Sequence, residues 1–521
     1  MQLKKLILRY KKYLPVIILG FFSFFINFYY GFIGVMPMDN FVLYNGGYRI
    51  LNGYIPFTDY WLVTGPLLDY LNALFFYFNG VNWTSYIIHS STFNTIISLA
   101  SYLLFVNLGL EKKFSLFYSI LFSILFYPIV GTPFVDHHST LFLLLAFYLF
   151  IFGVNKNNYI YFTFIPFFFS LSFLSKQTPA TYGLFAISFL IIFFLIINKK
   201  KRLDFFLQLG LGSIITILFL FLFFYFTKID IINFYDQYIL FAKTIGEFRF
   251  SKYNFNLIQV IYNYKFLSIL IGFLLIMLIR LILRKNNNSN DIFIILTAII
   301  LASLLIFHQI YTLNQNYIFF LIPFLTSIIH IFYKKIFKNK IILFFLILIC
   351  VYSTTKYHLR FNEQRKFNEL EKVDLSKAIN AEILTEDLKG LKWITYKYPN
   401  DPMDEIVNLK EVMAILSKDV SNKALITDYQ FLAPALKIYD FSPNQWHHPS
   451  VSFPLKDDMY YKKYQKFFFN SLKKNNIKFL YETSENENFI IEMVISKDCL
   501  IKEKMTKILT RFELVKGCQG F

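Results

Sequence analysis

The chain has 521 residues, of which 56% are hydrophobic, 21% are aromatic and 16% are charged. Soluble globular chains average about 25% charged residues, so the composition excludes an ordinary soluble enzyme and is typical of a membrane protein. The formal net charge of +19 does not indicate a nucleic-acid partner, because the basic residues form short clusters beside apolar runs, as in the positive-inside pattern.

The first apolar run covers residues 14–35 and follows a basic N-terminal stretch. It is long enough to cross a bilayer and no small-residue cleavage site follows it, so we expect a signal-anchor helix with a cytoplasmic N-terminus. A long loop, 36–85, comes next and is expected on the outer side. Within it, residues 40–51 and 67–78 are rich in aromatic side chains, which favours amphipathic helices lying along the membrane interface.

Further apolar runs follow, most of them about as long as a bilayer is thick. Assigning the loops rich in Lys and Arg to the cytoplasm gives one consistent topology. The sequence therefore predicts a polytopic α-helical membrane protein of about eleven spans, in which the two short runs at 138–154 and 159–175 are open to merging. The runs after the first are 86–108, 114–134, 138–154, 159–175, 179–198, 204–227, 262–283, 291–308, 317–333 and 340–354.

Beyond residue 354 the apolar runs shorten and charges of both signs appear. This change predicts two domains: a membrane domain over 1–354 and a soluble α/β domain over 355–521 on the outer face. Helical spacing of apolar residues predicts helices at 404–416 and 457–474. Strands are expected at 424–427, 478–481 and 489–494.

Two of the three cysteines, Cys499 and Cys518, lie in the expected outer domain, where oxidation is possible. We expect a disulfide between them that holds the C-terminal tail. Two free thiols are the alternative, because spacing alone does not decide. Cys350 lies in the last apolar run and is expected to be a small packing residue.

Two isolated acidic sites stand at the expected outer edge of the membrane. Asp39 follows the first run, and Asp136 opens the sequence Asp136-His137-His138 before the fourth run. Carboxylates at a membrane edge are costly, so they are functional candidates by default. The alternative is a helix cap, a position where Asp is common. We favour the functional interpretation for Asp39, and for Asp136 both interpretations stay open.

A series of short motifs follows the first run: Met-Asp39-Asn, then Tyr-Arg49, then Gly-Tyr-Ile-Pro-Phe-Thr-Asp59, then Gly65-Pro-Leu. In this order they resemble the GT-C class of polytopic glycosyltransferases, which includes protein mannosyltransferases and the aminoarabinose transferase of lipid A. The resemblance covers residues 1–340 in topology and is specific mainly over 36–70. One departure is that Thr64-Gly65 replaces a Lys that families close to the aminoarabinose transferase carry, which puts a phosphate contact from this position in doubt.

The resemblance implies an enzyme that transfers a sugar from a polyprenyl-phosphate donor to a glycan, lipid or protein acceptor on the outer face. Asp39 would correspond to the catalytic acidic residue after the first helix, and Asp136 to the carboxylate of the second outer loop. Lys176 resembles the Lys of a Phe-Leu-x-Lys stretch that many members carry. Lys176 and Arg49 are therefore expected to bind the donor phosphate, with snorkelling at the membrane interface as the alternative.

The chemistry makes the same demands. The acceptor hydroxyl needs a carboxylate within hydrogen-bond reach, and the leaving phosphate needs a cation or a metal. Asp39, Asp136 and His137 are candidate ligands of a divalent cation such as Mg, Mn or Zn. The adjacent residues Asp136, His137 and His138 do not easily all face one ion. Candidates for binding the sugar or acceptor, each of which has an ordinary structural alternative, are His137, His138, Asp59, His308, Gln309, Asn314, Gln315 and Trp446.

Two other functional classes compete with this hypothesis. A transporter or lipid flippase often shows inverted repeats and broken helices near the midplane, and the sequence shows no repeat. An O-antigen ligase or polymerase is expected to carry its large outer loop late among the spans, whereas here the long loop follows the first span. No Walker loop, nucleophile elbow or His-Glu-x-x-His motif is present. The expected location is a bacterial inner membrane, with the C-terminal domain in the periplasm.

Overall fold

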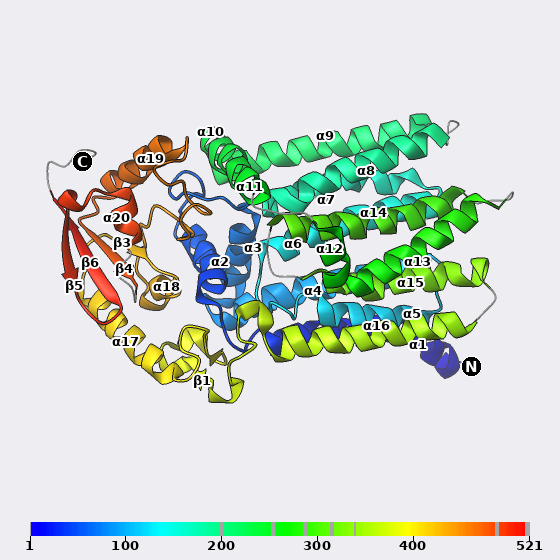
Figure 1. The fold of residues 1–521 in the computed structure, drawn as a ribbon, viewed down its shortest axis with the longest axis horizontal. Coiled ribbons are helices and arrows are strands. Elements are labelled where there is room, and N and C mark those ends of the chain that lie inside the picture. The colour runs from blue at the N-terminus through cyan, green and yellow to red at the C-terminus, as the bar shows by residue number, and fades with distance from the viewer. Residues whose placement is uncertain are drawn as a thin grey trace.

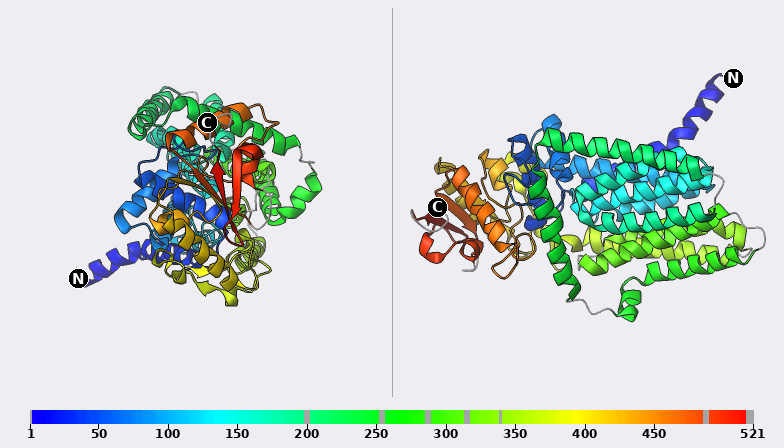
Figure 2. Two further views of the ribbon diagram at one scale, coloured as in Figure 1. Left: turned by 90° about the vertical axis from the view of Figure 1, so that its left-hand side faces the viewer. Right: turned by 90° about the horizontal axis from the view of Figure 1, so that it is seen from above.

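The computed structural model describes residues 2–197, 202–251, 256–284, 289–312, 317–337, 340–484 and 489–515. It has a bundle of long helices at one end and a smaller region with a β-sheet at the other (Figure 1). Helices α2 (Pro37–Leu51) and α3 (Leu67–Asn79) lie between these two parts. The two parts remain at opposite ends of the long axis when the molecule is seen from above (Figure 2).

Every apolar run predicted as a span contains a helix. Seven helices in the described part of the chain are long and apolar enough to cross a membrane: α1, α6, α8, α9, α13, α14 and α16. The remaining runs form shorter or more polar helices, so the count of eleven spans stays a prediction. The helices of the bundle are α1 (Gln2–Tyr30), α4 (Trp83–Asn107), α5 (Lys112–Leu125), α6 (Val135–Lys156), α7 (Ile165–Ser175), α8 (Gln177–Ile197), α9 (Arg202–Thr227), α13 (Lys265–Ile282), α14 (Ser289–Thr312), α15 (Leu321–Ile336) and α16 (Lys340–His358).

The outer surface of the bundle is apolar, as expected for a protein embedded in lipid. Only 11% of the apolar stretch of α9 is buried, and its exposed side chains include Phe221 and Ile214. A soluble protein rarely exposes so large an apolar surface to water. By contrast, 83% of the apolar stretch of α6 is buried, so α6 lies in the centre of the bundle.

The run at 114–134 is helical only in its first part. Helix α5 ends at Leu125, and residues 126–134 form a buried non-helical segment that leads into α6. Irregular backbone is tolerated at this depth only where protein covers it. This segment brings the start of α6, and with it Asp136, against the inside of the bundle.

The helices expected at 40–51 and 67–78 are present, but α2 does not lie on a membrane surface. Its Phe41 ring packs against Trp393 and Phe431 of the C-terminal region, with ring centroids 5.7 and 4.9 Å apart. Helix α3 does keep an exposed apolar face, with Leu74, Tyr77 and Phe78 at its outer side, as is typical of an interfacial helix.

The C-terminal region contains a four-stranded sheet with the order β3-β4-β6-β5. Strands β3 and β4 are parallel, with Lys423 opposite Phe479, and the other pairs are antiparallel. Helices α17 and α19 confirm the two predicted helices. The elements are β1 (Ile379–Asn380), β2 (Lys392–Trp393), α17 (Pro402–Lys418), β3 (Lys423–Ile426), α18 (Leu432–Leu436), α19 (Tyr461–Lys474), β4 (Phe479–Thr483), α20 (Ile490–Val494), β5 (Leu500–Lys504) and β6 (Leu509–Leu514).

The strands predicted at 424–427 and 478–481 are confirmed as β3 and β4, but the strand predicted at 489–494 is wrong. That segment forms the short helix α20. The cause is tertiary, because the carboxylate of Glu482 accepts hydrogen bonds from the backbone N–H groups of Ile490 and Ile491 and so caps the first turn. Cys499 is disulfide-bonded, whereas its expected partner Cys518 lies outside the described residues; Cys350 is free and buried.

The C-terminal region is joined to the near end of the bundle by buried contacts. The guanidinium of Arg365 donates hydrogen bonds to the carbonyl oxygens of Ile33, Pro128 and Val130, at 3.0, 2.8 and 2.8 Å. Lys392 exchanges backbone hydrogen bonds with Phe32 and Gly34 at the end of α1. The first outer loop and the C-terminal region therefore share one apolar core.

A further set of short helices lies at the end of the bundle next to the C-terminal region, and its first members, α10 and α11, are beside α19 (Figure 1). The ring of Phe241 in this set packs against Tyr460, with centroids 6.3 Å apart. These elements are α10 (Ile231–Phe234), the π-helix η3 (Tyr235–Phe241), α11 (Ala242–Ser251) and, further along the chain, α12 (Leu257–Asn263).

Candidate active site at the membrane edge

Asp136 is the centre of a buried polar cluster at the end of the bundle nearest the C-terminal region. One carboxylate oxygen lies 2.6 Å from the Nζ of Lys176, and the other lies 3.1 Å from the Nε2 of His308. The Asp136 side chain is 1% exposed and that of Lys176 is 16% exposed. Helices α6 and α14 and the break between α7 and α8 thus each contribute one side chain, which brings together three residues singled out in the sequence.

Helix capping does not account for the position of Asp136. The residue at the N-cap of α6 is Phe134, whose side chain makes no capping hydrogen bond. Asp136 lies in the first helical turn, where the positive end of the helix dipole favours a carboxylate. Its side chain is directed to Lys176 and His308, so the cluster and not a cap is its structural setting.

Lys176 reaches Asp136 because the chain is extended between α7 and α8, with φ −159° and ψ 141° at this residue. The first outer loop holds this break. The amide of Gln177 donates to the carbonyl oxygen of Val63 at 2.8 Å, and the backbone N–H of Gly65 donates to the carbonyl of Ser175 at 3.1 Å. Loop 63–65 therefore positions the lysine.

The close approach of this loop requires a glycine at position 65. A Cβ atom there would lie 1.8 Å from the carbonyl oxygen of Leu174, which is backbone and does not move aside easily. We expect Gly65→Ala to push the loop away from Lys176, lower the melting temperature of the detergent-solubilised protein and reduce activity. The control is Gly272→Ala in α13, where nothing lies within 4 Å of an added Cβ and φ is not positive; equal losses of activity in both variants would contradict the role given to Gly65.

Asp39 lies near this cluster on α2. Its side chain is partly exposed, and within the described ranges its carboxylate accepts no hydrogen bond. The N-cap of α2 is Met36, so Asp39 does not cap the helix. Burial raises the pKa of Asp39 to about 7, the negative charge of Asp136 adds to this rise, and Lys176 opposes it. Asp39 is therefore a carboxylate without a fixed partner in the electrostatic field of the Asp136–Lys176 pair.

A further cation near the cluster was missed by sequence reasoning. Burial lowers the pKa of Arg249 on α11, and the charge of Asp136 acts in the opposite direction. Helix α11 packs against α14. The two helices approach closely, because a Cβ added at Gly246 of α11 would lie only 2.3 Å from the hydroxyl of Tyr311 on α14. The only signal in the sequence was an Arg in the outer loop 228–260, and nothing there linked it to Asp136.

His137 and His138 turn away from Asp136. The His138 ring hydrogen-bonds to the hydroxyl of Tyr127 and, at 3.0 Å, to Nε2 of His89. The other nitrogen of His89 lies 2.5 Å from the amide oxygen of Asn72. His137 packs its ring against Tyr127 and Tyr317, with centroids 5.1 and 4.7 Å apart. These contacts tie α3, α4 and α6 together beneath the site.

Arg49 lies in a different network and does not join the Asp136 cluster. Its guanidinium is 2.7 Å from the carboxylate of Asp440, and both side chains are buried, at 2% and 3% exposure. The guanidinium also lies over the Tyr60 ring, 5.0 Å from its centroid. A cation neutralised and enclosed in this way is not available to a donor phosphate, so the expected phosphate role of Arg49 is not supported; it joins α2 to the C-terminal region.

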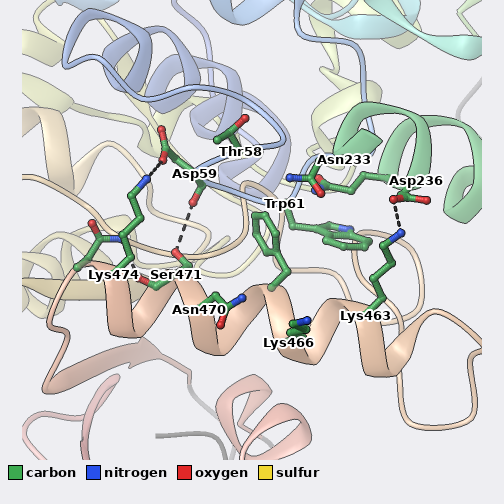
Figure 3. Close-up of a pocket in the computed structure, with 13 residues that line it drawn as sticks. Thr58, Asp59, Trp61, Asn233, Asp236, Lys463, Lys466, Asn470, Ser471 and Lys474 are labelled. Atoms are coloured by element: carbon green, nitrogen blue, oxygen red, sulfur yellow. Dashed lines mark hydrogen bonds and ion pairs between the residues drawn. The ribbon is translucent and has the colours of Figure 1, made fainter. Parts of the chain in front are cut away.

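Asp59 lies in a separate cavity of about 350 Å³, between the first outer loop, η3 and α19 (Figure 3). Its carboxylate is 2.8 Å from the Nζ of Lys474 and also accepts the backbone N–H of Ile55 at 2.8 Å. On the other side of the cavity, Lys463 pairs with Asp236. These pairs join α19 to the rest of the molecule, so Asp59 is placed apart from Asp39 and Asp136.

The remaining candidates have structural settings of their own. The side-chain oxygen of Gln309 accepts the backbone N–H of Tyr317 at 3.0 Å. Trp446 packs in an apolar cluster with Phe57 and Tyr60. Asn314 and Gln315 lie outside the described residues. Of the candidates in this stretch that the structure describes, His308 and Gln309, it is His308 that reaches the cluster.

In the described part of the chain the expected metal ligands are not gathered into one group. Among the residues that the structure describes, no group of three His, Cys, Asp or Glu side chains is placed to hold a metal ion. Both oxygens of Asp136 are taken by Lys176 and His308, and His137 packs between aromatic rings. We therefore derive no step through a metal, and metal dependence stays a prediction.

No family model and no curated protein matches the chain.

Proposed function

We propose that the protein is a membrane glycosyltransferase that moves a sugar from a polyprenyl-phosphate donor to an acceptor on the outer face. The observation that carries the proposal is that Asp39 lies within electrostatic range of the Asp136–Lys176–His308 cluster, where the helical bundle adjoins the loop 36–85. A carboxylate with a pKa near 7 suits a general base, and a cation beside it suits a leaving phosphate. These two features support the proposal, because glycosyl transfer requires both a base and a group that receives the leaving phosphate.

In the proposed reaction the acceptor hydroxyl attacks C1 of the donor sugar from the face opposite the phosphate. The new C1–oxygen bond forms while the bond from C1 to the phosphate oxygen breaks, and the phosphate leaves with the electron pair. Asp39 takes the proton of the acceptor hydroxyl. The product carries the inverted configuration at C1.

Lys176 is the group that we propose to meet the leaving phosphate. An ammonium has three N–H donors, and one of them is held by Asp136 at 2.6 Å. Within the described part of the chain no other acceptor is bound to Lys176, so its remaining donors can bind phosphate oxygens, and Asp136 fixes the direction in which they point. Arg249 is the second cation within the electrostatic range of this cluster, and a guanidinium is suited to phosphate.

The placement of the charged residues favours this enzyme over a transporter. Asp136 stands in the first turn of α6 and His308 in the last part of α14. Both are therefore at helix ends beside the outer loops, whereas the substrate sites of many transporters lie near the bilayer midplane.

The test is a transfer assay in proteoliposomes with a panel of polyprenyl-phosphate sugars, each carrying a radiolabelled sugar, and a panel of saccharide and lipid acceptors. The expected result is label in the acceptor together with release of one polyprenyl phosphate per sugar transferred. Label that crosses the bilayer still attached to its lipid, with no product, would overturn the proposal and indicate a flippase.

A further inference from the structure

A second cavity, of about 370 Å³, opens at the edge of the C-terminal sheet. Its wall includes Thr427 and Asp428, which follow β3, and Thr483 at the end of the neighbouring parallel strand β4. The carboxyl ends of adjacent parallel strands are a recurrent place for ligands, because the chain connections there leave a crevice. The size is in the range of cavities that hold small molecules.

The cavity is adjacent to the candidate base. Met38 of α2 forms part of its wall, and Asp39 is the next residue along the chain. Burial is the main cause of the raised pKa of Asp39, and the negative charge of Asp428 in the cavity wall adds to it. A ligand in the cavity would therefore lie next to the turn of α2 that carries Asp39.

The polar groups of the wall have little net charge. Lys397 and Asp428 form an ion pair at 2.6 Å, and burial raises the pKa of Glu482 to about 7. Burial lowers the pKa of His447 to about 4, so its ring is neutral at physiological pH. A wall with donors, acceptors and balanced charges matches a neutral ligand with many hydroxyl groups better than an anion such as phosphate.

His447 adds an independent observation. It is 6% exposed and lines the cavity, and neither of its ring nitrogens has a hydrogen-bond partner among the described residues. Buried polar groups without a partner are rare in folded proteins and call for an explanation. A ligand hydroxyl in the cavity would supply one.

We propose that this cavity binds the acceptor as a neutral saccharide and presents one of its hydroxyl groups to Asp39. The donor lipid and the acceptor sugar would then approach Asp39 from two sides, the first from the bundle and the second from the C-terminal sheet. The assignment of the saccharide as acceptor rests on the proposed function, whereas saccharide binding at this cavity does not.

The first experiment measures binding without any transfer. Methyl glycosides of glucose, galactose, mannose and N-acetylglucosamine, and their disaccharides, are added to the full-length protein in detergent, and saturation-transfer NMR reports contact. We expect at least one saccharide to bind, with the signal reduced at least fivefold in His447→Leu, which keeps an apolar side chain in the buried position. His448→Ala is a second variant of the same cavity, at an exposed position where a substitution should not impair folding. Lys466→Met, in the cavity beside Asp59, is the matched control.

The second experiment measures transfer. We expect His447→Leu and His448→Ala to raise the KM for the acceptor about tenfold and to leave the KM for the polyprenyl-phosphate donor unchanged. Saccharide binding that depends on His447, in a protein without transfer activity, would support the cavity and overturn the proposed function. Binding unaffected by both cavity variants, or no binding of any saccharide by the wild type, would overturn the cavity assignment.

Discussion

Replacing Asp39 with Asn is expected to lower the rate of sugar transfer by roughly 10²–10⁴-fold, the contribution typical of a general base. The amide keeps the shape of the carboxylate but does not take up the proton of the acceptor hydroxyl. The substitution should not disturb packing, because the Asp39 carboxylate holds no hydrogen bond within the described part of the chain. Initial rates in proteoliposomes with saturating donor measure the effect.

Asp69→Asn is the matched control for this variant. Burial raises the pKa of Asp69 to about 7, as it does for Asp39. Asp69, however, accepts hydrogen bonds from Tyr60 and Gln445, each at 3.0 Å, and lies in another network. We expect Asp69→Asn to retain transfer within a few-fold. Equal losses in the two variants would mean that buried carboxylates support the fold and would count against a base at Asp39.

The pH dependence of transfer should follow the same group. The base acts only when ionised, so the rate of the wild type is expected to rise with pH and to level off above about 7, the pKa of Asp39.

The contribution of Asp39 to the stability of the fold changes with pH in the opposite direction to the transfer rate. Since the folded pKa exceeds the ordinary value of 3.8, the unfolded chain loses its proton first, and the contribution of Asp39 to stability falls between pH 3.8 and about 7. Asp39→Asn should therefore raise the melting temperature at pH 8 while it lowers the rate of transfer.

Replacing Lys176 with Met is expected to have the second large effect, on both stability and transfer. Asp136 is 1% exposed, and this substitution removes the cation 2.6 Å from its carboxylate. Breaking a buried pair by removing one partner typically costs about 3–5 kcal/mol, because it leaves an uncompensated charge. Thermal unfolding in detergent measures the first effect, and the transfer assay measures the loss of the phosphate contact.

A double variant separates these two roles of Lys176. Lys176→Met combined with Asp136→Asn leaves no unpaired charge, so we expect most of the lost stability to return. Transfer should stay low, because the cation that we propose to meet the leaving phosphate is still missing. Recovery of transfer together with stability would show that Lys176 serves the fold alone.

Sequence reasoning reached the features that depend on local composition. The apolar runs must form helices in lipid, since backbone groups there find partners only within the helix, and each run does contain one. Asp39 and Asp136 were predicted as candidates from their positions at the ends of these runs. A carboxylate beside an apolar stretch is unusual, and this argument does not depend on the rest of the chain. The helices α17 and α19 followed from the spacing of their apolar residues in the same way.

Tertiary structure alone decided which of these residues meet. The pairs Asp136–His308 and Arg49–Asp440 join positions 172 and 391 residues apart, and no local pattern encodes a partner at that distance. Contacts with the C-terminal region bury α2, which was expected to lie at the membrane interface. The carboxylate of Glu482 caps α20, which was expected to be a strand. Local hydrophobicity determines where helices form, but the pairing of buried charges depends on how those helices pack. Packing places Lys176 beside Asp136, whereas it places Arg49 beside Asp440 in the core.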